Sequence, residues 1–183
     1  EIAVAEGSLS KKAEFFTKYC NIKQNSSQAW LSGEVVQLAC GPHINPEDFR
    51  NCYCVGGIDL SRTTDLTACV VIIEKKGKLY VLAHFFLPGE KLQEATERDG
   101  LPYSVYVQRG LLTLSGENFV DYHDCFNWFR TLVEKYKIYP LKVGYDRYTA
   151  QYLVQDMKQY GFHMDDVFQG FNLTPVIQET EGL

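Results

Sequence analysis

The first 50 residues and the rest of the chain differ in how their apolar residues are arranged. Residues 1–50 show weak periodicity, contain a polar run at residues 25–28 and are interrupted by Pro42 and Pro46. This pattern is typical of an extended arm. From residue 51 the apolar positions become regular. We therefore predict a linker arm over residues 1–50 and a folded domain over residues 51–183.

Three short apolar runs open the predicted domain. They cover residues 53–60, 66–74 and 79–87 and are rich in β-branched and aromatic side chains, as strands are. The sequence Lys75-Lys76-Gly77-Lys78 separates the second run from the third and is typical of a tight turn. The three runs therefore predict an antiparallel meander.

Helical and strand patterns alternate in the second half of the domain. Aromatic and aliphatic residues at three- and four-residue steps predict a helix with one buried stripe, formed by Phe119, Tyr122, Phe126, Phe129, Val133 and Tyr136. A strand over 141–146, a helix over 150–161 and a strand over 163–168 follow. Crossovers between such strands make them parallel. We predict an α/β fold in which a mixed sheet, a three-strand antiparallel meander plus parallel strands, is flanked by helices.

Composition narrows the class of protein. Of the 183 residues 45% are hydrophobic and 14% aromatic, which is enough for a core. No apolar run approaches the roughly 20 residues of a membrane-spanning helix. The six scattered cysteines, with Cys52 and Cys54 one residue apart, predict reduced thiols and no structural zinc. The formal net charge of −5 excludes nucleic-acid binding by bulk positive charge, so such a partner would need a local patch or bound cations.

Two carboxylates stand out because each lies in an apolar strand. Asp59 follows Gly57-Ile58, and Asp146 ends the run Val143-Gly144-Tyr145. Carboxyl ends of neighbouring strands lie about 4.8 Å apart and form ligand crevices, so these acids could hold one hard cation together. Such a site suits metal-assisted phosphoryl transfer. On spacing alone, a second interpretation stays open, in which the two acids cap turns or pair with Arg62 and Arg147.

Asp65 would return the chain over the same end of the sheet. Its residue type also fits a turn-forming aspartate, and residue chemistry favours that second interpretation. No G-x-x-x-x-G-K-[ST] or G-x-G-x-x-G motif is present, so the sequence indicates no nucleotide-binding loop.

Several motifs together resemble a known family. Residues 57–68 read GIDLSRTTDLTA, residues 143–148 read VGYDRY, and Gln169-Gly170 follow. In this order and spacing they resemble the nuclease domain of tailed-bacteriophage terminase large subunits. Residues 21–31 resemble the segment that joins the motor to the nuclease in that family. The resemblance covers nearly the whole chain, and the block around Asp59 is its most specific part.

The resemblance implies an RNase H-like fold and a two-metal-ion endodeoxyribonuclease that cuts concatemeric double-stranded viral DNA during genome packaging, in a phage or a prophage. Asp59 and Asp146 match the family's metal-binding aspartates, with Asp59 bridging two Mg²⁺ or Mn²⁺ ions and Asp146 holding one of them. Asp65 matches an acid of less defined catalytic role. Arg62, Arg109 and Arg147 are the candidates for phosphate contacts with DNA. The alternative is a solvated surface arginine or a bridge to a neighbouring aspartate, and this alternative is favoured for Arg109.

The same resemblance implies partners and a location. The expected partners are an ATPase domain in the same parent chain, the small terminase subunit and the portal. The expected location is the cytoplasm of the bacterial host. Family members carry a further acid beyond the segment that matches Gln169-Gly170, and residues up to Leu183 supply no clear substitute. We therefore expect this part of the nuclease to bind metal weakly and to cleave poorly.

Two alternatives from other classes accompany this hypothesis. The first is a docking or DNA-binding module that keeps the sheet but lacks a complete catalytic site. The second is another RNase H-like phosphotransferase, such as a recombinase or transposase core, which would use the same two acids.

Overall fold

The computed structural model describes residues 33–41, 44–61, 65–146, 151–168 and 170–181. The chain divides into two units, Glu1–Ile44 and Asn45–Leu183. In the first unit the structure describes helix α3 (Gly33–Ala39), in which no residue is buried. The second unit contains the sheet and both aspartates of the predicted site.

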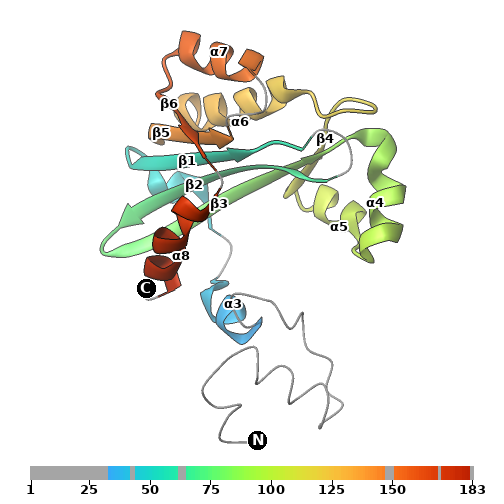
Figure 1. The fold of residues 1–183 in the computed structure, drawn as a ribbon, viewed down its shortest axis with the longest axis horizontal. Helices are drawn as coiled ribbons and strands as arrows, with labels where there is room; N and C mark the ends of the chain where they lie inside the picture. Colours follow the sequence, from blue (N-terminus) through green and yellow to red (C-terminus); the bar gives the residue numbers. More distant parts are fainter. Residues whose placement is uncertain (1–32, 42–43, 62–64, 147–150, 169, 182–183) are drawn as a thin grey trace, which may run out of the picture. The chain divides into compact units, whose positions relative to one another are not determined.

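Among the described residues, six strands form one mixed sheet in the order β4-β3-β2-β1-β5-β6 (Figure 1). The strands are β1 (Tyr53–Asp59), β2 (Thr67–Lys75), β3 (Lys78–Leu87), β4 (Leu112–Leu114), β5 (Tyr139–Asp146) and β6 (Met164–Val167). Neighbours β1, β2 and β3 pair antiparallel. The pairs β1–β5, β5–β6 and β3–β4 are parallel. The predicted meander plus parallel strands is confirmed.

A two-residue turn joins β2 to β3, as the sequence predicts. Lys75 pairs with Lys78, and between them Lys76 and Gly77 have φ angles of 55° and 72°. Two consecutive positive φ angles are typical of the turn whose twist matches that of a β-hairpin. Glycine adopts this conformation without steric cost, which is why the hairpin turns at Gly77.

Helices α6 (Tyr122–Glu134) and α7 (Gln151–Tyr160) are the crossovers and cover one face of the sheet (Figure 1). Cys125, Phe126, Phe129 and Leu132 of α6 are buried, and Leu153, Val154 and Met157 of α7 join them. The predicted stripe is wrong at both ends: Phe119 precedes the helix and is 63% exposed, and Tyr136 follows its last residue, Glu134. Asp121 caps the helix by accepting a hydrogen bond from the His123 N–H at 2.9 Å, so the helix begins only at Tyr122.

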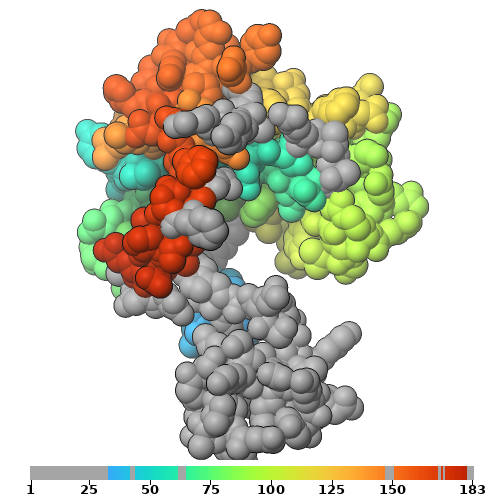
Figure 2. Space-filling view, in the orientation of Figure 1, coloured from blue at the N-terminus to red at the C-terminus, as the bar shows by residue number. Residues whose placement is uncertain are grey.

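The segment between β3 and β4 packs around a second, smaller hydrophobic core. This segment contains α4 (Leu92–Asp99) and α5 (Tyr103–Gln108), preceded by the short helix η2 (Gly89–Lys91). Leu87, Ala95, Tyr103 and Leu112 are buried together there. Figure 2 shows this segment as a green bulge at one end of the molecule. Strand β4 has only three residues. So short a segment cannot show a clear helical or alternating pattern, so it cannot be predicted from the sequence.

The other face of the sheet remains open among the described residues. Val55, Ile72 and Val81 lie on it and are between 44% and 55% exposed. Register places them on the same side as Gly57 and Asp59, because side chains alternate along each strand. Helices η1 (Pro46–Phe49), η3 (Phe171–Leu173) and α8 (Thr174–Glu181) complete the described elements.

Five cysteines lie in the described part of the chain, and all are free, as expected for reduced thiols. A hydrogen bond with Cys125, followed by burial, raises the pKa of the Cys69 thiol, so this pair behaves as core side chains. The described helices include none that is long and apolar enough to cross a membrane.

Close packing between β1 and α6 yields a stability prediction. A Cβ atom at Gly56 would lie 2.8 Å from Cε1 of the buried Phe129 and 3.1 Å from Cγ2 of Val143. We expect Gly56→Ala to lower the free energy of unfolding by about 1–3 kcal/mol, measured by urea denaturation. Gly57→Ala is the matched control, since its Cβ would meet only Val70 Cγ1, at 3.3 Å. Equal effects of both substitutions would contradict this account of the packing.

Candidate functional site

Asp59 and Asp146 are brought side by side by the parallel pairing of β1 with β5. Gly57 pairs with Gly144 and Ile58 with Tyr145, so the next residue of each strand is an aspartate. Both carboxylates lie on the face of the sheet that carries Gly57 and Gly144, because the side chains alternate. Neighbouring strands are about 4.8 Å apart, which places two acids within reach of one cation.

A register shift makes this alignment possible. Cys54 pairs with Pro140 but Val55 pairs with Lys142, so Leu141 is an extra residue in β5. Without this bulge Asp59 would lie opposite Tyr145, and Asp146 would extend one residue further. Bulges of this kind re-aim side chains next to functional sites. Leu141 thus determines which side chains meet at the end of the two strands.

The two carboxylates differ in exposure: Asp59 is exposed and Asp146 is half-buried. Helices α6 and α7 cover the opposite face of the sheet (Figure 1). A bulky ligand can therefore approach Asp59 from the side that these two crossovers leave uncovered.

Three hydrogen bonds hold Ser61, two residues after Asp59. The Ser61 N–H donates to Thr67 Oγ1 at 3.1 Å, and the Tyr122 hydroxyl donates to the Ser61 carbonyl oxygen at 2.9 Å. The Asp65 N–H donates to Ser61 Oγ at 3.1 Å. Thr67 is fully buried. The exit from β1 is therefore tied both to β2 and to the first turn of α6, which limits how far Asp59 can move.

Asp65 lies at the same end of the sheet as Asp59 and pairs with an arginine from another part of the chain. Its side chain is 83% exposed, and its Oδ1 is 4.0 Å from Nη2 of Arg98 in α4. The structure therefore brings Asp65 to an arginine that sequence reasoning missed. Nothing in the pattern of residues 92–99 indicates that Arg98 reaches across to the loop after β1.

Arg98 is itself held by a carboxylate and a tyrosine. Its Nε and Nη2 donate to the two oxygens of Asp99 at 2.7 and 2.8 Å, and the Tyr103 hydroxyl donates to Asp99 Oδ2 at 2.9 Å. The hydrogen bond from Arg98, followed by that from Tyr103, holds the pKa of Asp99 below its ordinary value. The bond to Asp99 raises the pKa of Arg98. The Arg98 guanidinium is therefore held in place near the exit of β1.

Tyr122 is a second residue whose role the sequence conceals. Its place in the aromatic stripe predicts a core side chain, yet it is half-buried and its hydroxyl reaches Ser61. A tyrosine at the start of an otherwise phenylalanine-rich stripe is the available signal, since a buried hydroxyl needs a partner. Of the remaining candidates, Arg62 and Arg147 lie outside the described residues, and Arg109 is exposed at the C-cap of α5.

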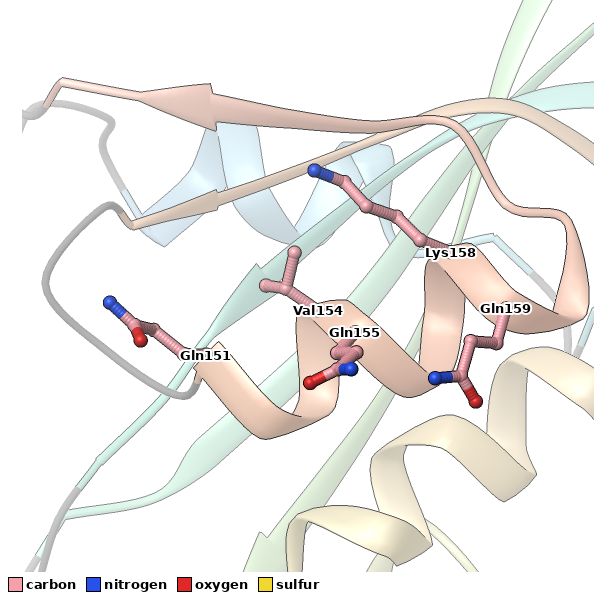
Figure 3. Close-up of a pocket in the computed structure, with 5 residues that line it drawn as sticks. All are labelled: Gln151, Val154, Gln155, Lys158 and Gln159. Atoms are coloured by element: carbon pink, nitrogen blue, oxygen red, sulfur yellow. The ribbon is translucent and has the colours of Figure 1, made fainter.

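Two hollows of the described surface lie away from Asp59 and Asp146. One of about 500 Å³ runs along the outside of α7 and is lined by Gln151, Val154, Gln155, Lys158 and Gln159 (Figure 3). Another of about 700 Å³ includes Lys142, His163 and Asp165 near the amino ends of β5 and β6. Neither of these two hollows contains Asp59 or Asp146, and in the second an ion pair of 2.6 Å joins Lys142 to Asp165.

The donor set at Asp59 and Asp146 suits a hard cation only in part. Within the described ranges, no group of three or more histidine, cysteine, aspartate or glutamate side chains could hold a metal ion. Mg²⁺, however, retains several waters and is commonly bound by one or two carboxylates together with phosphate oxygens of the substrate. Two adjacent carboxylates therefore fit one such ion when DNA supplies further oxygens.

Comparison with known proteins assigns the family. The sequence model of a family described as "Terminase large subunit, endonuclease domain" matches residues 1–183. The chain belongs to this family. Its predicted resemblance to terminase nuclease domains is thereby confirmed.

A curated relative and a solved structure agree with this assignment. The chain is 28% identical over 131 residues to the terminase large subunit of Enterobacteria phage HK97, covering 69% of this chain and 26% of the relative. The crystal structure of the HK97 large terminase matches with a TM-score of 0.72 and 25% identity, over 99% of this chain and 37% of that chain. The predicted RNase H-like mixed sheet is confirmed. The chain spans well under half the length of these relatives.

The anchoring of Ser61 generates a prediction for this terminase domain. Tyr122→Phe removes the hydroxyl that binds the Ser61 carbonyl. We expect it to lower the free energy of unfolding by about 1 kcal/mol in chemical denaturation. Tyr152→Phe in α7, where the side chain is 86% exposed, serves as the control and should change nothing. If both substitutions leave stability unchanged, the hydrogen bond to Ser61 does not anchor this segment.

Proposed function

We propose that this chain is the metal-dependent endonuclease domain of a phage terminase large subunit and cuts concatemeric double-stranded viral DNA during packaging. The observation that best supports the proposal is the β1–β5 register, which aligns Asp59 and Asp146 at the carboxyl ends of their strands, on the open face of the sheet. Membership of the terminase family supports the same activity. The alternative recombinase or transposase core has no comparable support.

Asp59 and Asp146 would hold the divalent ions, Mg²⁺ or Mn²⁺, that a two-metal-ion nuclease uses. Such ions, when bound, supply an activated water and stabilise the leaving oxygen of a phosphodiester. The chain's own contribution is positional. Ser61, Thr67 and Tyr122 fix the exit of β1, so Asp59 is held before substrate arrives and little ordering is left to binding.

Charge at this end of the sheet is mixed. Helix α6 begins at Tyr122, whose hydroxyl donates to the Ser61 carbonyl oxygen, so the positive end of the helix dipole lies near the exit of β1. Arg98 is shared between Asp65 and Asp99, so these three side chains keep a net negative charge. The helix dipole and a cation held by Asp59 and Asp146 would therefore attract the DNA backbone here, in a chain whose net charge is −5.

The wider assembly follows from the family. We propose that the parent chain contains a packaging ATPase domain, that it works with the small terminase subunit and the portal, and that it acts in the cytoplasm of the bacterial host. A second candidate function is a docking or DNA-binding module without catalysis. The observation that favours this second function is the lack, within the described residues, of any group of three metal-ligating side chains.

Nicking of supercoiled plasmid with Mn²⁺ or Mg²⁺ tests the proposal. Removing one charge from the pair should reduce the rate about a hundredfold or more, since metal-held charge stabilisation is worth several kcal/mol. We expect this result for both Asp59→Asn and Asp146→Asn. Asp156→Asn changes an exposed acid of α7 and should leave the rate unaltered.

Circular dichroism of each variant confirms that the sheet is retained. Nicking that survives Asp59→Asn in a folded protein would contradict the catalytic assignment. Nicking that is absent from the wild type, together with intact DNA binding, would favour the docking module.

A further inference from the structure

Arg98 lies near the carboxyl end of β1, where the proposed chemistry takes place, although it comes from a different part of the chain. Helix α4 follows the carboxyl end of β3, which is parallel to β1, so both segments leave the sheet at the same end. Figure 1 shows α4 and α5 beyond that end. The 4.0 Å approach of Arg98 Nη2 to Asp65 Oδ1 places the guanidinium beside the segment that begins at Asp59.

The guanidinium is oriented before any ligand binds. Nε and Nη2 engage both oxygens of Asp99, and the hydroxyl of Tyr103 fixes that carboxylate from the other side. Tyr103 is only 6% exposed and belongs to the small core under α4 and α5. An arginine ordered in this way loses little side-chain entropy when it binds, which is the usual advantage of a preorganised contact.

The contact with Asp65 is, by contrast, easily exchanged. At 4.0 Å it is longer than a hydrogen bond, and the Asp65 side chain is 83% exposed. Exposed ion pairs of this kind contribute little. A phosphate presents more oxygens and forms shorter, charge-assisted hydrogen bonds with a guanidinium. Losing the ion pair with Asp65 therefore costs little free energy.

We propose that Arg98 contacts a backbone phosphate of duplex DNA, next to the phosphodiester that Asp59 and Asp146 address. The inference rests on the proposed function, because it takes DNA as the ligand of this edge. Arg98 acts as a DNA-binding residue that sets the position of the duplex. The backbone is the target, so the contact is independent of base sequence.

Equilibrium DNA binding in EDTA tests this proposal separately from cleavage. The probe is a fluorescent 20-base-pair duplex, titrated with the whole chain between about 50 and 200 mM salt. One phosphate contact contributes about 0.9 to the slope of log K against log salt, which is about eightfold in affinity at 0.1 M salt. We expect Arg98→Gln to show both losses. Arg98→Lys keeps the charge and should recover part of the affinity.

Arg130→Gln is the matched control. Arg130 is 43% exposed, against 40% for Arg98, and lies 3.9 Å from Glu134 within α6. Removing it should leave both affinity and salt slope unchanged. If Arg98→Gln and Arg130→Gln have equal effects, or if Arg98→Gln lowers thermal stability while the salt slope is unchanged, the proposal is overturned.

The outcome is separable from that of the nuclease proposal. Unchanged DNA affinity in Arg98→Gln, with nicking that still depends on Asp59, would reject the Arg98 contact alone. A reduced salt slope in Arg98→Gln, without nicking by the wild type, would retain the contact and reject the catalytic proposal.

Discussion

The parallel pairing of β1 with β5 is the constraint on which the rest of the site depends. It joins segments almost ninety residues apart in the sequence, and a bulge at Leu141 adjusts its register so that Asp59 and Asp146 come level. A shift of one residue would turn one carboxylate to the face covered by α6 and α7. Close contact between Gly56 and Phe129 and the burial of Val143 hold the two strands against α6. The packing of the core therefore also determines the geometry of the site in this domain.

The predictable part of the fold is the part that local periodicity encodes. Alternating and continuous apolar runs identify β1, β2, β3, β5 and β6, and the turn at Gly77 identifies the hairpin. Strand β4 is too short for any period, and its existence depends on Leu112 packing against Leu87 and Tyr103, which are distant in sequence. Phe119 has the right spacing for the helical stripe, but the helix begins only after its N-cap at Asp121, so Phe119 lies outside it.

The candidate site divides in the same way. Asp59 and Asp146 can be found from the sequence because each is an acid in an apolar strand, and the carboxyl ends of adjacent parallel strands lie next to each other. Arg98 cannot be found in this way, because its pairing with Asp65 depends on how α4 packs on the small core. The roles of Tyr122 and Thr67 also depend on tertiary contact, since each is the partner of Ser61 only after β1, β2 and α6 have assembled.

The central claim is that Asp59 and Asp146 form one cation site, and a paramagnetic titration tests it most directly. In ¹H–¹⁵N spectra of the whole chain, substoichiometric Mn²⁺ should broaden the amide signals of Ile58, Asp59, Tyr145 and Asp146 together. Asp146→Asn should abolish the broadening at Asp59 as well. Broadening confined to other acids, or broadening at Asp59 that persists unchanged in Asp146→Asn, would contradict the account.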